Sequence, residues 1–181
     1  FKKHKDDKVL EQEWLIDNII PKEDLSYIYC DAGTGKSTLM GQISCAIATK
    51  QEELFEGIKI HATYNRVLLA AIEENPNRVM KRLQLQSKAI NGKELIDMDN
   101  DSLIIYPEGE DLKKSLTNFI AEHNYEFDLL IIDSLTEYIA INNGDSNNQE
   151  KVRSLMNDFK ELAHKHHIPV LFVGHTRKKN D

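Results

Sequence analysis

The chain has 181 residues, of which 40% are hydrophobic, and it carries a net charge of −7 with two cysteines. This length suffices for one domain with a sizeable core, and the acidic balance argues against a surface that coats nucleic acid broadly. No apolar run approaches the roughly 18 residues that a membrane crossing needs. The charged residues 1–7 are not followed by a signal-peptide core, so we expect a cytoplasmic protein without a membrane partner or a structural disulfide.

Residues 1–25 are predicted to form an N-terminal lead segment, ahead of a core domain over residues 26–181. In the lead, the apolar groups Trp14-Leu15-Ile16 and Ile19-Ile20 are spaced as in a short helix or an extended segment at a sheet edge. Pro21 then marks a turn before the first core strand.

The stretch 27–38 has the order strand, glycine-containing loop and helix that is typical of a phosphate-binding site. Gly33 and Gly35 let backbone N–H groups turn toward phosphate oxygens, and the helix N-terminus adds to that field. We expect Lys36 to reach the β- and γ-phosphates and Ser37 to bind Mg²⁺. The residues predicted to bind the nucleotide are Asp31, Ala32, Gly33, Thr34, Gly35, Lys36, Ser37 and Thr38.

Cys30 stands where the complete motif has its first glycine. Its small side chain is compatible with a strand end, but the departure leaves an ordinary glycine-rich turn before a helix as the alternative. The features that follow along the chain favour the nucleotide site.

Apolar runs and helical stripes alternate through the rest of the chain. The predicted strands are 58–60, 67–72, 103–106, 127–132 and 168–173, and the predicted helices have apolar stripes over 39–47, 79–90, 112–120 and 152–163. The Gly- and Asn-rich stretch 140–149 is predicted to be a loop. This alternation predicts an α/β fold in which a parallel sheet is flanked by helices on both faces.

Four predicted strands are followed by a polar residue: Asp31, Glu73, Asp133 and His175. Because ligands of such sheets bind beyond the carboxyl ends of the strands, we expect these four ends to converge. Asp133 is a candidate carboxylate for Mg²⁺, and the alternative is a strand-end Asp that caps a turn.

Glu73 is a candidate to polarise the water that attacks the γ-phosphate. Glu74 competes for that role, and a helix N-terminal acid favoured by the helix dipole is the simpler interpretation of either. His175 is suited to sense the γ-phosphate through a hydrogen bond or to satisfy a loop carbonyl, and the sequence leaves both open.

Four segments in this order resemble the RecA-type ATPases: CDAGTGKST, VLLAAIEENPNRVMKRL, FDLLIIDSL and IPVLFVGHTRK. The similarity covers residues 14–178 and is greatest to the group that includes the RepA-like hexameric helicases of plasmids and phages. It implies a RecA-like P-loop NTPase core in which Lys36, Ser37 and Thr38 hold phosphates and Mg²⁺. In the same resemblance, Glu73 is the catalytic base and Asp133 the Walker B carboxylate.

The resemblance also assigns roles near the end of the chain. His175 would occupy the sensor position, on a strand between the two Walker strands, and Arg177 or Lys178 would reach the γ-phosphate of a neighbouring subunit. The family core continues beyond the sensor strand, so we expect this chain to lack its C-terminal strands.

The function predicted from these features is an ATP-hydrolysing, ring-forming motor with ATP and Mg²⁺ as cofactors. It would act as a helicase or translocase of the plasmid or phage replication type, as a hexamer, on single-stranded DNA. A regulatory or recombination-accessory ATPase that switches assembly on ATP binding is the alternative. A small-molecule kinase is a third, disfavoured by the mid-sheet Glu73 and by the lack of an Arg-rich lid.

Overall fold

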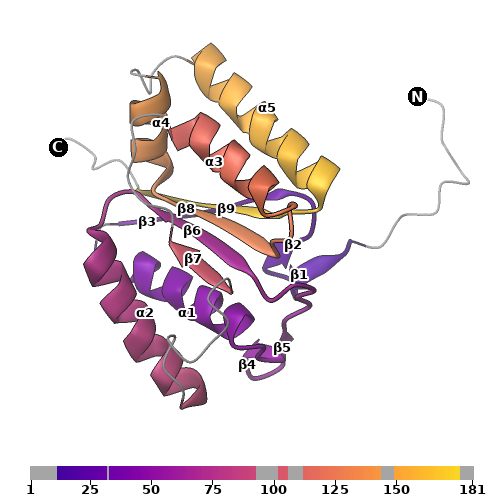
Figure 1. Ribbon diagram of the computed structural model, residues 1–181, viewed down its shortest axis with the longest axis vertical. Helices are drawn as coiled ribbons and strands as arrows, with labels where there is room; N and C mark the ends of the chain where they lie inside the picture. Colours follow the sequence, from indigo (N-terminus) through magenta and orange to yellow (C-terminus); the bar gives the residue numbers. More distant parts are fainter. Residues whose placement is uncertain (1–11, 32, 93–101, 106–111, 144–148, 176–181) are drawn as a thin grey trace, which may run out of the picture.

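Five parallel strands form the central sheet of the computed structural model, which describes residues 12–31, 33–92, 102–105, 112–143 and 149–175 (Figure 1). Their order across the sheet is β3-β9-β8-β6-β7. The strands are β3 (Leu25–Cys30), β6 (Val67–Ala71), β7 (Leu103–Ile105), β8 (Leu129–Asp133) and β9 (Val170–His175). The predicted α/β fold with a parallel sheet is confirmed.

The register brings the strand ends into line. β9 lies between β3 and β8, where it pairs His175 with Cys30 and Val173 with Asp133. On its other side β8 pairs Asp133 with Ala71, the last residue of β6. Because all the strands run the same way, their carboxyl ends form one edge, which we call the carboxyl edge.

Helices cover both faces of the sheet, as predicted. One face packs against α1 (Lys36–Ala48) and α2 (Pro76–Asn91), and the other packs against α3 (Leu112–Glu122), α4 (Leu135–Asn143) and α5 (Gln149–His166) (Figure 1). Alternate strand residues separate the two cores: Leu69 and Ile131 belong to the first, and Leu68 and Leu130 to the second. This double burial explains the unbroken apolar runs of β6 and β8.

Two small antiparallel hairpins lie outside the main sheet. β1 (Trp14–Ile16) pairs with β2 (Ile20–Pro21), so the lead segment is extended rather than helical. β4 (Glu53–Phe55), which the sequence did not indicate, pairs with β5 (Ile58–Lys59). Ile16 is fully buried and bridges to Ile60, which joins the first hairpin to the second.

One prediction needs correction. The loop predicted over 140–149 is wrong at both ends, because α4 runs to Asn143 and α5 begins at Gln149; residues 144–148 lie outside the described part. α4 forms because Leu135, Tyr138 and Ile139 recur at helical spacing and pack into the second core. β3, the predicted first strand of the core domain, lies in the main sheet at an edge of its described part, and its Tyr27 is 44% exposed.

Among the described helices, none combines the length and apolar composition that a membrane crossing needs.

Candidate nucleotide-binding site

The described residues of the turn between β3 and α1 have the backbone angles expected at the glycines of a phosphate-binding loop. Gly33 and Gly35 have φ angles of 78° and 89°, in the left-handed region that favours glycine. Gly35 precedes the first residue of α1 and has no side chain with which to cap it. The N–H groups of the first turn therefore remain available to an anion, which the helix dipole also favours.

Lys36 is nearly buried within this loop, with 7% of its surface exposed. Its Nζ donates to the backbone oxygens of Cys30 at 2.9 Å and Asp31 at 2.8 Å. In the described part of the chain the ammonium is thus held by carbonyls and not neutralised by a carboxylate. Its positive charge is available to a phosphate.

Asp133 lies at the end of β8 and is 9% exposed. Burial raises its pKa, and the charge of Glu73 raises it further. A hydrogen bond with the Ser37 side chain lowers the pKa, as do the positive charges of Arg82 and His175. The hydroxyl and the carboxylate expected to bind Mg²⁺ are therefore neighbours at this edge.

Glu73 joins the ends of three strands. Its Oε1 accepts a hydrogen bond from the Ser134 hydroxyl, and its Oε2 lies 3.1 Å from Nε2 of His175. Glu74 points elsewhere and accepts from Nη1 of Arg82 on α2. Of the two acidic candidates, Glu73 is the one that faces the carboxyl edge, and His175 meets this carboxylate rather than a loop carbonyl.

The loop also explains how Cys30 is accommodated. The Thr34 hydroxyl donates to Sγ of Cys30 at 3.0 Å and to the carbonyl of Asp31 at 2.8 Å.

The carbonyl of Thr38 accepts a hydrogen bond from Nε2 of Gln86, which ties the first turn of α1 to α2. Ala32, Arg177 and Lys178, also predicted for the site, lie outside the described residues.

Sequence reasoning missed Ser134, Arg82 and Gln86 as members of this region. Ser134 directly follows Asp133 at a strand end, and that position alone is a usable signal. The contacts of Arg82 and Gln86 depend on how α2 packs on α1, which no local pattern reveals.

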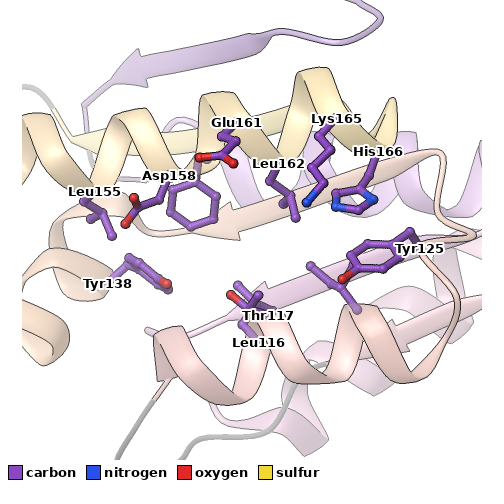
Figure 2. A pocket seen from close by; sticks show the side chains of 12 residues that line it. Leu116, Thr117, Tyr125, Tyr138, Leu155, Asp158, Glu161, Leu162, Lys165 and His166 are labelled. Carbon is purple, nitrogen blue, oxygen red and sulfur yellow. The ribbon is translucent and has the colours of Figure 1, made fainter.

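A hollow on the opposite face of the sheet is not suited to a triphosphate. It lies between α3 and α5, has a volume of about 320 Å³ and has Leu116, Tyr138 and Leu155 among its apolar lining residues (Figure 2). Lys165 lines it, but so does the acidic Glu161. The polar groups of the carboxyl edge are the better match to a nucleotide.

A family model described as an AAA domain matches residues 4–181. The chain belongs to this family of AAA-type P-loop ATPases. No curated protein matches the chain in sequence. ATPases of this family generally bind ATP with Mg²⁺. The residues present fit that pair: an uncapped helix N-terminus and the Lys36 ammonium suit the phosphates, and Ser37 beside Asp133 provides the oxygen ligands that Mg²⁺ prefers.

Proposed function

We propose that the protein hydrolyses ATP at the carboxyl edge of its sheet. Lys36 and the first turn of α1 hold the phosphates, and Ser37 and Asp133 hold Mg²⁺. The metal supplies charge neutralisation on the phosphate oxygens. The observation that carries the proposal is the contact of Glu73 with Ser134 and His175, on the same edge as these binding groups.

Glu73 acts as the general base in this proposal. The water oxygen bonds to the γ-phosphorus, the bond from that phosphorus to the bridging oxygen breaks, and ADP leaves with the electron pair. Glu73 takes the proton of the water. The contacts of Ser134 and His175 with this carboxylate support a role for both in orienting it. In this proposal His175 also senses the γ-phosphate.

At a finer level, we propose a RecA-like motor that forms a ring, a hexamer as in the RepA-like helicases, and moves on single-stranded DNA. The four segments similar to RecA-type ATPases support this, as does the position of β9 between β3 and β8. In such a ring ATP lies between subunits, and Arg177 or Lys178 of the neighbouring subunit stabilises the transition state.

A regulatory ATPase that switches assembly on ATP binding is the second candidate, and the net charge of −7 favours it. A strand-displacement assay on a tailed DNA duplex separates the two functions. Unwinding that requires ATP excludes the switch-only function. ATP-dependent assembly without unwinding excludes the helicase.

Glu73→Gln tests the proposed chemistry, and Glu74→Gln is its matched control. We expect Glu73→Gln to lower phosphate release by about 10²–10⁴-fold, the usual contribution of a general base, while binding of a fluorescent ATP analogue persists. Glu74→Gln should retain most of the activity, because Glu74 contacts Arg82 and not the carboxyl edge. Equal activity losses in both variants would remove Glu73 from the role of base.

A further inference from the structure

α2 carries a groove that the proposed chemistry does not use. Its lining residues follow one face of the helix, with one residue from α1, and enclose about 410 Å³: Gln42, Arg78, Lys81, Arg82, Leu85, Gln86 and Ala89. We call this the α2 groove. The cationic residues lie in the first half of the helix, and Leu85 and Ala89 lie in the second.

The α2 groove concentrates positive charge in a chain with a net charge of −7. Arg82 is paired with Glu74, whereas Arg78 and Lys81 form no ion pair with any described residue. Beyond them, Leu85 is 64% exposed. The surface is therefore suited to a ligand that presents carboxylates next to an apolar group.

The β4–β5 hairpin of the same chain presents that combination. Leu54 is buried and anchors the hairpin, so its neighbours Glu53 and Phe55 point outward by the alternation of a strand. Phe55 is 48% exposed. Glu52 and Glu56 are exposed and form no ion pair within the described part of the chain.

We propose that the β4–β5 hairpin of one copy of this chain docks into the α2 groove of a second copy. Phe55 packs on Leu85, and Glu52 and Glu56 face Arg78 and Lys81. The inference rests on the proposed function only in requiring self-association, and it names the surfaces through which copies join.

The two surfaces are different parts of the chain, and in this proposal the contact repeats head-to-tail from copy to copy. The cationic residues of the α2 groove belong to the first turns of α2. Figure 1 shows that this end of the helix lies next to the carboxyl edge. The hairpin follows the far end of α1, whose 13 residues span about 20 Å. Contacts of this kind close into rings when the rotation between copies permits.

Charge reversal tests the interface. The groove variant is Arg78→Glu with Lys81→Glu, and the hairpin variant is Glu52→Lys with Glu56→Lys. We expect each variant to fall to the monomer mass by light scattering after gel filtration, with ATP and Mg²⁺ present. The matched control, Arg153→Glu with Lys160→Glu on the exposed side of α5, should keep the parental mass.

Mixing gives the sharpest readout. The groove variant retains its hairpin and the hairpin variant retains its groove, and the two reversed surfaces are complementary in charge, so an equimolar mixture should recover assembly with the two variants alternating. All four reversals in one chain should recover assembly. Circular dichroism melting of each variant checks that the fold persists, and both reversed surfaces are exposed.

Three results would overturn the interface. If the parent assembles and the reversed variants keep its mass, the contact lies elsewhere while the proposed ring stands. If the groove variant assembles normally but loses binding to a single-stranded oligonucleotide, the groove is a nucleic-acid surface. If the parent stays monomeric with ATP and DNA, both this interface and the ring fail, whereas ATP hydrolysis is tested separately by Glu73→Gln.

Discussion

The two helices that begin at the carboxyl edge on one face of the sheet differ at their first residues. α2 is capped by its own sequence, because Oδ1 of Asn75 accepts from the backbone N–H of Asn77 at 3.0 Å and Pro76 has no N–H to satisfy. α1 follows Gly35 and has no such cap. Of these two helix N-termini, only that of α1 is left open to an anion.

The cap of α2 also accounts for the different contacts of the two acidic residues that precede this helix. Since Asn75 already caps the helix, Glu73 is not needed at the helix terminus, and its carboxylate turns to Ser134 and His175. Glu74 is held by Arg82. The Asn75 cap of α2 thus leaves the Glu73 carboxylate to contact the neighbouring strand ends. These ends lie beside the uncapped N-terminus of α1, where we propose that a phosphate binds.

Of the variants that test this difference between the two helices, the one that removes the Lys36 ammonium at α1 should have the largest effect on activity. We expect Lys36→Ala to lower ATP hydrolysis by about 10³-fold, because a buried charge aimed at the phosphates is lost. Phosphate release at saturating ATP and Mg²⁺ measures the effect. A Lys36→Ala protein with parental activity would show that α1 is not the phosphate site.

Removing the cap at α2 should have a smaller effect of another kind. We expect Asn75→Ala to lower the free energy of unfolding by about 1 kcal/mol, because the N–H of Asn77 loses its partner. Urea denaturation measures this change, and affinity for a fluorescent ATP analogue should stay near the parental value. A loss of affinity without a loss of stability would mean that α2 contributes to the nucleotide site.

Much of the site is predictable because the carboxyl ends of parallel strands lie at one edge of the sheet, whatever the order of the strands. Glu73, Asp133 and His175 each follow an apolar run, and parallel strands place such residues together in any order. The choice between Glu73 and Glu74 is not predictable in this way. It depends on the turn after β6 and on Arg82, which lies on α2, eight residues after Glu74.

The elements that the sequence missed are those stabilised by contacts with other elements. α4 ends in a polar, Asn-rich stretch, and it is held by Tyr138, which packs against Phe159 of α5. β4 has three residues and exists through its pairing with β5 across the Glu56-Gly57 turn. Local propensity is weak in both, so tertiary packing decides.

The two cysteines, Cys30 at the end of β3 and Cys45 on α1, differ in exposure. Cys45 is fully buried, its thiol donates to the carbonyl of Leu83 on α2, and burial raises its pKa to about 12. Cys30 is partly exposed at the end of β3, directly before the glycine-containing turn. Because the thiolate is the reactive form, we expect one thiol per native chain to react with a disulfide reagent at pH 8, and two after denaturation.

Raising the pH from 8 to 9.5 should leave Cys45 unreactive, since its folded-state pKa lies above both values. ATP with Mg²⁺ should slow the remaining reaction, because phosphates bound at the turn that follows Cys30 would cover its thiol. Cys30→Ala is the control and should leave no thiol that reacts quickly. Rapid labelling of Cys45 in that variant would mean that α1 and α2 separate in the native state, and the tie between Gln86 and Thr38 would then not hold the phosphate-binding helix in place.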